Sequence, residues 1–263
     1  MSSLTLTIIQ TDLSWENKAA NLQRLKEKIE RMEQRTEIVV LPEMFSTGFT
    51  MVPELFAETM DGETVAWMKD IAETNKIIVT GSLIIEEDGL YFNRLIWMLP
   101  NGQSGHYDKR HLFGYGEEDK HYTAGNKRLI ASVKGWRINL QICYDLRFPV
   151  WSRQQQSASA ESEYDLLIYV ANWPERRSHA WKTLLCARAI ENQCFVAGVN
   201  RVGNDNKNVY YSGNSLVIDP LGQVLYHMAD EEDVFTITLQ KEDVDKVRAQ
   251  YPFWKDADVF TIH

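Results

Sequence analysis

The sequence predicts an α/β protein built as a four-layer α-β-β-α sandwich, with two mixed β-sheets packed face to face and helices outside. Strand-like and helix-like segments alternate along the 263 residues, which is typical of the α/β class. Runs of strands joined by tight turns exclude a purely parallel sheet. Short, wholly apolar segments indicate strands that are buried on both faces, as inner layers require.

The first half of the chain opens with an apolar, β-branched segment and continues with a helix that Ser14 or Asn17 caps. Apolar residues recur at helical spacing after that cap, at Leu22, Leu25, Ile29 and Met32. Asn101-Gly102 between two apolar runs predicts a hairpin. The expected elements are strands at residues 1–10, 38–41, 77–85, 91–99 and 103–108, and helices at about 18–32 and 63–74.

The second half repeats this order. A helical stretch follows Pro149, and Ser178 is the predicted cap of a helix that runs to about Asn192. The expected strands are residues 137–142, 166–170, 195–200, 211–218 and 224–228, with one more strand and a short helix after Val234. Residues 91–103 and 211–223 share a pattern of Tyr, Asn, Pro, Gly and Gln, which indicates either two similar halves around one core or a chance similarity of hairpins.

Composition narrows the classes of function. A formal net charge of −9 argues against a nucleic-acid partner, whose binding relies on basic patches. No apolar run approaches the roughly 18 residues of a membrane span, and the opening segment lacks the basic region of a signal peptide. Cys143, Cys186 and Cys194 are too few for a disulfide framework, so we expect free thiols and a cytoplasmic location.

Cys143 stands where an apolar strand turns toward a helix. Such an elbow holds a nucleophile clear of a sheet and directs backbone N–H groups to one point. The alternative is a small buried hydrophobic residue, a common fate of free cysteine. Cys186 and Cys194 are interpreted as core residues.

Two further candidates also follow predicted strands. Glu43 comes directly after the apolar segment 38–41, at the sheet edge where α/β proteins bind ligands. Lys109 follows the segment 103–108, and Glu117 and Glu118 lie in an acidic loop beyond it. Taken singly, each of these charged residues could equally well be a solvated surface residue with no role in a site.

The order Glu43, Lys109, Cys143 resembles the nitrilase superfamily of carbon–nitrogen hydrolases over nearly the whole chain. Four segments carry the resemblance in the family's order: LPEMF at 41–45, YDKRHLF at 107–113, ICYDLRFP at 142–149 and ARAIENQ at 187–193. FSTGF at 45–49 and VANWP at 170–174 are similar to the bacterial ω-amidases, which act on 2-oxoglutaramate and related ω-amides of dicarboxylic acids.

The resemblance implies a thiol amidohydrolase. Cys143 is the implied nucleophile and Glu43 the base, while Lys109 and the backbone N–H of Tyr144 form an oxyanion hole. The family's supporting glutamate is matched best by Glu118, with Glu117 as the second choice. The alternatives are another amide hydrolase or an N-carbamoyl-amino-acid hydrolase, a non-catalytic binding protein, and a redox thiol protein.

A substrate with a distal carboxylate requires a cation or hydrogen-bond donors. Arg147 is one candidate, and Arg176 or Arg177 are others, because a guanidinium binds a carboxylate bidentately. The remaining residues expected to bind substrate or to form the walls of the site are Phe45, Phe113, Tyr144, Asn172 and Trp173. Core packing or a structural salt bridge is the competing explanation for these side chains.

No zinc-ligand spacing and no glycine-rich phosphate loop occur, so we expect neither a metal nor another cofactor. Residues 1–263 are interpreted as a single carbon–nitrogen hydrolase domain. The aromatic tail at about 240–263 is expected to dock on a partner subunit. Relatives in the family commonly dimerise, and the resemblance therefore implies a homodimer.

Overall fold

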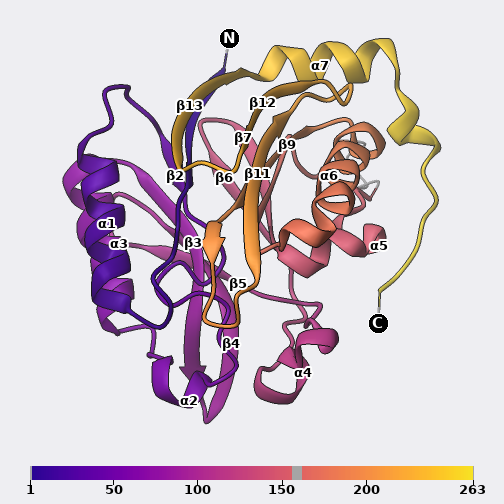
Figure 1. Cartoon of the computed structure of the whole chain (residues 1–263). Coiled ribbons are helices and arrows are strands. Elements are labelled where there is room, and N and C mark those ends of the chain that lie inside the picture. The colour runs from indigo at the N-terminus through magenta and orange to yellow at the C-terminus, as the bar shows by residue number, and fades with distance from the viewer. Residues whose placement is uncertain (1, 156–161, 263) are drawn as a thin grey trace.

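The computed structural model describes residues 2–155 and 162–262 of the chain. Two β-sheets lie against each other in the middle of the molecule, and helices cover their outer faces (Figure 1). Strands and helices lie close to the bounds predicted from the sequence, apart from the strands β6 (Leu129–Val133) and β10 (Val202–Asn204) and the one-turn helices α2 (Pro53–Phe56) and α4 (Glu118–His121), which no pattern predicted. The two strands are short edge strands, and partial exposure leaves them little apolar patterning.

The first sheet has the strand order β13-β1-β2-β3-β4-β5. β1, β2 and β3 are parallel, while β13, β4 and β5 run antiparallel to their neighbours. The strands are β1 (Ser3–Gln10), β2 (Ile38–Val40), β3 (Ile78–Glu87), β4 (Leu90–Met98), β5 (Ser104–Asp108) and β13 (Asp233–Gln240).

The second sheet has the order β10-β11-β9-β8-β7-β6, and β12 also pairs with β11. Here β7, β8 and β9 are parallel, and β6 and β11 are antiparallel to them. The strands are β6 (Leu129–Val133), β7 (Trp136–Ile142), β8 (Leu166–Ala171), β9 (Phe195–Asn200), β10 (Val202–Asn204), β11 (Tyr210–Ile218) and β12 (Val224–Ala229).

The α-helices are α1 (Lys18–Glu30), α2 (Pro53–Phe56), α3 (Glu63–Asn75), α4 (Glu118–His121), α5 (Pro149–Ser152), α6 (Ser178–Asn192) and α7 (Lys241–Gln250). Of the two caps considered for α1, the structure has Asn17, whose side chain accepts from the backbone N–H of Ala20 at 3.1 Å. The cap predicted at Ser178 is wrong. Ser178 already has helical dihedrals because the 3₁₀ turn Glu175–Arg177 leads directly into α6.

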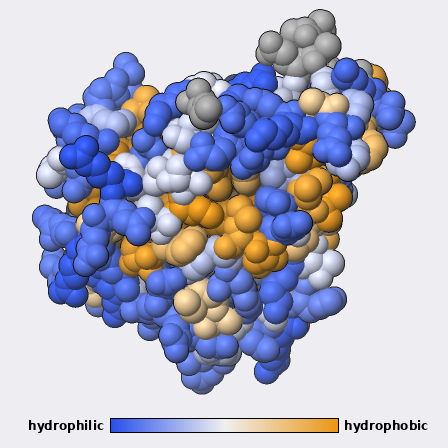
Figure 2. All heavy atoms as spheres, turned by 90° about the horizontal axis from the view of Figure 1, so that it is seen from above, coloured by the Kyte–Doolittle hydropathy of each residue, from blue (hydrophilic) through white to orange (hydrophobic). Residues whose placement is uncertain are grey.

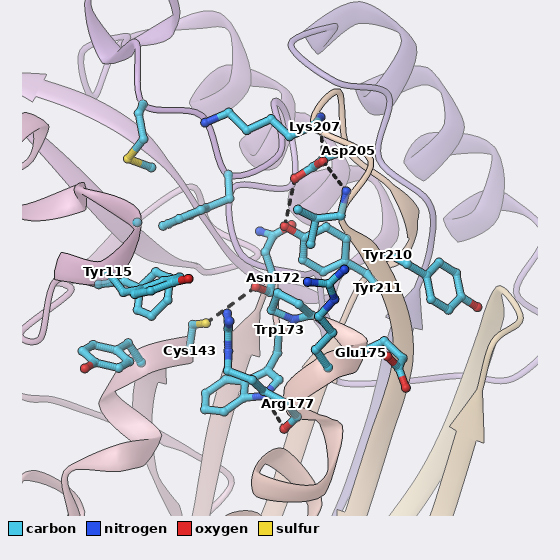
Figure 3. Close-up of a pocket in the computed structure, with 18 of the residues that line it drawn as sticks. Tyr115, Cys143, Asn172, Trp173, Glu175, Arg177, Asp205, Lys207, Tyr210 and Tyr211 are labelled. Atoms are coloured by element: carbon cyan, nitrogen blue, oxygen red, sulfur yellow. Dashed lines mark hydrogen bonds between the residues drawn. The ribbon is translucent and has the colours of Figure 1, made fainter.

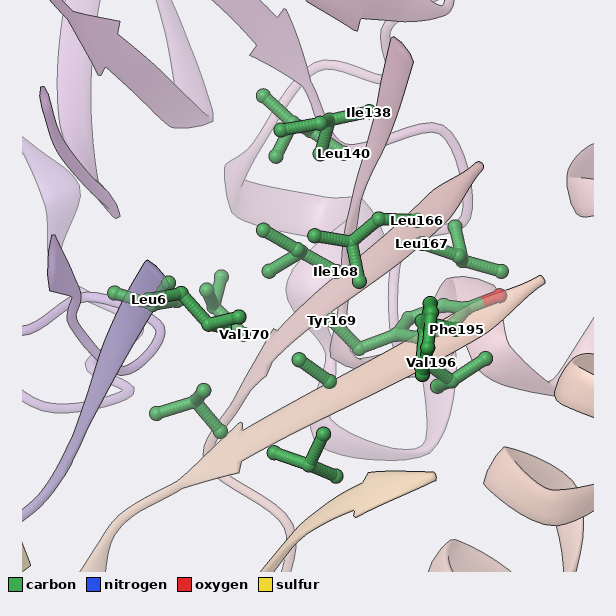
Figure 4. Close-up of a cluster of buried hydrophobic side chains, with 14 of the residues drawn as sticks. Leu6, Ile138, Leu140, Leu166, Leu167, Ile168, Tyr169, Val170, Phe195 and Val196 are labelled. Carbon is green, nitrogen blue, oxygen red and sulfur yellow. The ribbon is translucent and has the colours of Figure 1, made fainter. Parts of the chain in front are cut away.

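Alternating side chains in the first sheet divide the molecule into layers. Leu6 and Ile8 of β1 point into a cluster shared with the second sheet, whereas Ile9 points to the opposite face, where α1 and α3 pack. Leu6 lies opposite the apolar side chains of β7, β8 and β9 (Figure 4). The predicted four-layer sandwich is therefore confirmed.

The two sheets follow the same plan. The chain traces β1-β2-β3-β4-β5 in one sheet and β7-β8-β9-β11-β12 in the other, with three parallel strands followed by two antiparallel ones. The echoing segments 91–103 and 211–223 begin in β4 and β11, which occupy matching positions. This correspondence favours two similar halves over a chance resemblance of hairpins.

No helix within residues 2–155 and 162–262 is long and apolar enough to cross a membrane. Seen from above, the surface is mainly hydrophilic with a central band of hydrophobic residues (Figure 2). The C-terminal segment contacts its own chain, because the side chain of Gln193 donates to the carbonyl of Tyr251 and accepts from the N–H of Trp254. Phe253 and Val259 of this segment are exposed.

Candidate active site

A cavity of about 580 Å³ opens where strands of both sheets end. Lys109 follows β5 of the first sheet, and Cys143 follows β7 of the second, and both line this cavity. Asn172 and Trp173 follow β8 and form another part of its wall (Figure 3). The two halves of the chain therefore meet at one site.

Glu43 is placed by an unusual turn after β2. Met44, the next residue, has a positive φ of 43°, a conformation that costs a non-glycine residue free energy. Ser82 of β3 stabilises this turn, because its hydroxyl accepts from the N–H of Met44 at 2.9 Å and its carbonyl from that of Phe45 at 3.1 Å. The Glu43 side chain is fully buried and points back toward the second sheet.

Lys109 lies between two buried carboxylates. Its Nζ donates to Glu43 Oε1 at 2.8 Å and to Glu118 Oε2 at 2.9 Å, and all three side chains are 0% exposed. Of the two candidate supporting glutamates, Glu118 occupies this position. Glu117 points into solvent and pairs with Lys120. The first residue of α4 is thus the one that reaches Lys109.

Burial and charge act in opposite directions on this cluster. Burial by itself lowers the pKa of Lys109, but attraction to Glu118 and then to Glu43 outweighs it, so the pKa is raised and the ammonium form is favoured. Burial raises the pKa of Glu118, the charge of Lys109 only partly offsets this, and repulsion from the nearby carboxylate of Glu43 raises the pKa further.

Asn93 of β4 is a member of this cluster that the sequence analysis did not identify as a site residue. Its Nδ2 donates to Glu43 Oε1 at 2.8 Å and to Glu118 Oε1 at 3.1 Å, and its carbonyl accepts from the N–H of Lys109. A neutral donor between two carboxylates lowers the cost of their proximity. The one feature of the sequence that could have singled out Asn93 is its place in residues 91–103, whose pattern recurs at residues 211–223.

Cys143 follows β7 with a positive φ of 44° and begins the 3₁₀ turn Cys143–Arg147. Its Sγ lies 4.0 Å from the carbonyl of Asn172 (Figure 3). Burial raises the pKa of this thiol well above its ordinary value, the charge of Glu43 raises it further, and the charge of Lys109 opposes the shift. A thiol in this state requires a base to remove its proton.

Asn172 connects the two sheets at the site. Its backbone N–H donates to Glu43 Oε2 at 2.7 Å, and its Nδ2 donates to the carbonyl of Glu43 at 2.6 Å. Glu43 and Cys143 therefore share Asn172 as a neighbour, since the carbonyl of Asn172 faces the thiol of Cys143. Although Asn172 lines the cavity, its hydrogen bonds go to Glu43.

Aromatic rings hold cations at the cavity wall. The guanidinium of Arg147 lies 4.9 Å from the ring centre of Trp173, and that of Arg177 lies 5.1 Å from the ring centre of Phe113. Tyr144 meets Phe113 edge to face at 5.0 Å. All of these side chains line the cavity, as does that of Arg176. The aromatic rings form part of its wall, and the arginines are candidates for binding an anion.

The prediction of Phe45 as a wall of the site is wrong. Its ring is fully buried in the cluster between the first sheet and its covering helices, where it lies 5.9 Å from the ring of Trp67. The turn at Met44 reverses the chain and directs Phe45 inward. Phe49, four positions on, contributes to the cavity wall instead and lies under the Lys109 ammonium at 5.2 Å.

Across the part of the chain that the structure describes, no group of three or more His, Cys, Asp or Glu residues is arranged to hold a metal ion. The thiols of Cys143, Cys186 and Cys194 are all free. Cys194 is buried and Cys186 half-buried, and neither lines the cavity.

A buried Glu–Lys–Glu cluster beside a cysteine at a strand-to-helix elbow is the kind of arrangement that a thiol hydrolase requires. The family model described as carbon-nitrogen hydrolase matches residues 5–249, and the chain belongs to this family of amidohydrolases. A solved structure from Xanthomonas campestris, described as a CN-hydrolase superfamily protein with an arsenic adduct in the active site, is 42% identical over 100% of both chains, with a TM-score of 0.97.

Curated relatives narrow the comparison further. The chain is 41% identical to the omega-amidase YafV of Escherichia coli (strain K12), over 100% of both sequences. It is 33% identical to the 2-oxoglutaramate amidase of Bacillus subtilis (strain 168), over 96% of both. The relatives thus carry the names of ω-amidases, in agreement with the resemblance found in the sequence.

Proposed function

We propose that this chain hydrolyses the terminal amide of small dicarboxylic acid monoamides, such as 2-oxoglutaramate, 2-oxosuccinamate or succinamate, to the acid and ammonia. The observation that carries the proposal is the joint placement of Glu43, Lys109 and Cys143 beside a cavity whose three arginines pair with no carboxylate among the described residues. The names of the relatives support the same class of substrate.

The first half-reaction forms a thioester. Sγ of Cys143 attacks the amide carbon while Glu43 accepts the thiol proton. The Lys109 ammonium and the N–H of Tyr144 stabilise the negative charge that develops on the carbonyl oxygen. The carbon–nitrogen bond then breaks, and protonated Glu43 transfers its proton to the leaving nitrogen, which departs as ammonia.

The second half-reaction hydrolyses the thioester. Glu43, again a carboxylate, takes a proton from water as the water oxygen attacks the acyl carbon. The carbon–sulfur bond breaks, the acid is released, and the proton on Glu43 returns to Sγ of Cys143. Lys109 stabilises the oxyanion in both half-reactions, and Glu118 holds Lys109 in place.

The distal carboxylate of the substrate is bound by guanidinium groups at the cavity wall. Within the described residues, Arg147, Arg176 and Arg177 form no ion pair, in contrast to the buried Arg94 and Arg201, which both do. Arg147 is the leading candidate because it lies four residues past the nucleophile and its guanidinium is held over Trp173. The unpaired charge favours an anionic ligand.

The test is ammonia release by the purified chain. We expect turnover of 2-oxoglutaramate and succinamate, little release from an N-carbamoyl amino acid, and none from either ω-amide with Cys143→Ala. Turnover of the N-carbamoyl amino acid alone would instead identify the chain as an N-carbamoyl-amino-acid hydrolase. Activity that survives in Cys143→Ala would refute the assigned nucleophile.

We also propose that the chain forms one domain and acts in the cytoplasm as a homodimer. Both sheets contribute side chains to one buried cluster, and the three thiols are free. Phe253 and Val259 expose apolar surface on the C-terminal segment, which a second copy of the chain would cover. Light scattering tests the dimer, and a monomeric mass would contradict it.

A further inference from the structure

The carboxylate of Asp145 accepts four hydrogen bonds although the residue is 0% exposed. Oδ2 accepts from the N–H of Ile142 at 3.0 Å and from the hydroxyl of Tyr107 at 2.7 Å. Oδ1 accepts from the backbone N–H of His111 at 3.0 Å and lies 2.8 Å from Nδ1 of the same residue. Because a carboxylate has no proton to donate, Nδ1 carries the proton in this contact.

These donors come from the two segments that carry the proposed chemistry. Tyr107 and His111 flank Lys109 by two residues on either side, and Ile142 directly precedes Cys143. A single buried carboxylate thus joins the backbone around Lys109 to the elbow of Cys143. The connection is independent of the contacts through Glu43 and Asn172.

The elbow requires such support. A positive φ of 44° at Cys143 is unfavourable for a residue with a side chain, and it persists only where the surroundings impose it. The donors to Asp145 are themselves held in place. Trp151 Nε1 donates to the hydroxyl of Tyr107 at 2.9 Å, and the ring of His111 stacks on Phe148 at 3.9 Å.

We propose that Asp145 is a positioning residue, which fixes the Cys143 elbow relative to Lys109 and Glu43. This inference rests on the proposed role of Cys143 as the nucleophile. Asp145 is not among the residues that line the cavity, so it acts through the backbone it holds. A misplacement of about 1 Å at a reacting centre can cost roughly 100-fold in rate.

Asp145→Asn tests the inference with a side chain of the same shape. An amide has one oxygen and one NH₂ group, and the NH₂ group cannot accept a hydrogen bond. Whichever way the amide is turned, its NH₂ group faces either the N–H of Ile142 or the N–H of His111. We expect kcat for an ω-amide to fall by about 100-fold, with a much smaller change in KM.

Asp165→Asn is the matched control. Asp165 is also a buried aspartate that accepts from a backbone N–H, that of Arg137 at 3.1 Å, and it directly precedes β8. Unlike Asp145, it also pairs with Lys241 and Arg248. It therefore lies at the end of β8 away from Asn172 and the site. We expect this variant to lower the melting temperature and to leave kcat per folded molecule unchanged.

A second readout does not depend on any amide substrate. The rate at which iodoacetamide alkylates Cys143, followed on the Cys143 peptide by mass spectrometry, reports the placement of the thiol beside Glu43. We expect about tenfold slower alkylation in Asp145→Asn, no change in Asp165→Asn, and a smaller decrease in Tyr107→Phe, which removes one of the four donors. Wild-type kcat and alkylation in folded Asp145→Asn would refute the positioning role, even if the proposed substrates proved wrong.

Discussion

The two halves of this chain follow the same strand plan, but the segments at the ends of their strands supply different groups to the site. In the first half, the segments after β2 and β5 supply Glu43 and Lys109, which are fully buried and paired with each other. In the second half, the segments after β7 and β8 supply Cys143 and Asn172, which border the open cavity. The first half provides the buried Glu–Lys pair and the second provides the nucleophile. Both contribute to the cavity wall, for example Phe49 from the first half and Trp173 from the second.

The comparison shows two ways of treating charge at a binding site. Lys109 is neutralised by Glu43 and Glu118 before any ligand enters, so its position is set during folding. Arg147 and Arg177 rest on aromatic rings and form no ion pair with any residue that the structure describes. Pre-paired charges suit a catalytic apparatus that is rigid, whereas unpaired ones suit recognition of an anion.

The two halves also bind each other at equivalent points. Glu43 follows β2 and Asn172 follows β8, strands that occupy matching places in the two sheets. These two residues are joined by the hydrogen bonds from Asn172 to the carboxylate and the carbonyl of Glu43. The site itself therefore makes one of the contacts between the halves.

Removal of the Lys109 charge should produce the largest effect. In Lys109→Met, Glu43 and Glu118 remain buried without their cation, which we expect to lower the free energy of unfolding by about 3–5 kcal/mol. Urea unfolding at pH 7 measures this. The loss should shrink toward pH 5 as Glu118, whose pKa is already raised, takes up a proton, and a loss that is independent of pH would contradict the pairing.

Removal of a cation from the other half should affect binding instead. Arg147→Met removes a guanidinium that no described carboxylate pairs with, so we expect little change in stability. KM for succinamate should rise by roughly 10- to 150-fold, the equivalent of about 1.5–3 kcal/mol for a charged hydrogen bond. An uncharged amide of similar length is the control, and an equal loss for both would contradict recognition of the carboxylate.

The smallest effect concerns alkaline stability. The folded chain retains the Cys143 proton above the ordinary thiol pKa of 9.0, whereas the unfolded chain releases it. The free energy of unfolding therefore falls as pH rises above 9, by up to about 1.4 kcal/mol per pH unit from this group. Urea unfolding of Cys143→Ala between pH 8 and 10.5 should show a correspondingly shallower decline. Parallel curves for the two proteins would argue against the raised thiol pKa.

Much of the fold could be predicted because strands and helices are governed by local patterns. Hydrophobic spacing located α1 and α3, and the Asn101-Gly102 turn located the β4–β5 hairpin. Ser178 shows the limit of such patterns, because a preceding 3₁₀ turn shifted the helix start by one residue. Phe45 shows another, because the positive φ at Met44 changed the direction of its side chain.

The residues of the candidate site also divide into those that local patterns predict and those that they do not. Glu43, Lys109 and Cys143 could be proposed from the ends of predicted strands and from the family resemblance. Asn93 could not, because an asparagine inside a strand has no local mark of the two carboxylates that it contacts. The choice between Glu117 and Glu118 also required coordinates, since the direction of neighbouring side chains depends on one turn of backbone.

The sequence by itself determined the class of fold, the order of strands and helices, the presence of three free thiols and the identity of the principal site residues. These depend on periodicity, composition and short motifs, which are local properties of the chain. Only the tertiary structure decided which residues meet, namely Glu118 with Lys109, Asn93 with both carboxylates, Asn172 with Glu43 and Asp145 with the segments around Lys109 and Cys143. These contacts join residues distant in sequence, and their geometry is set by how two sheets pack.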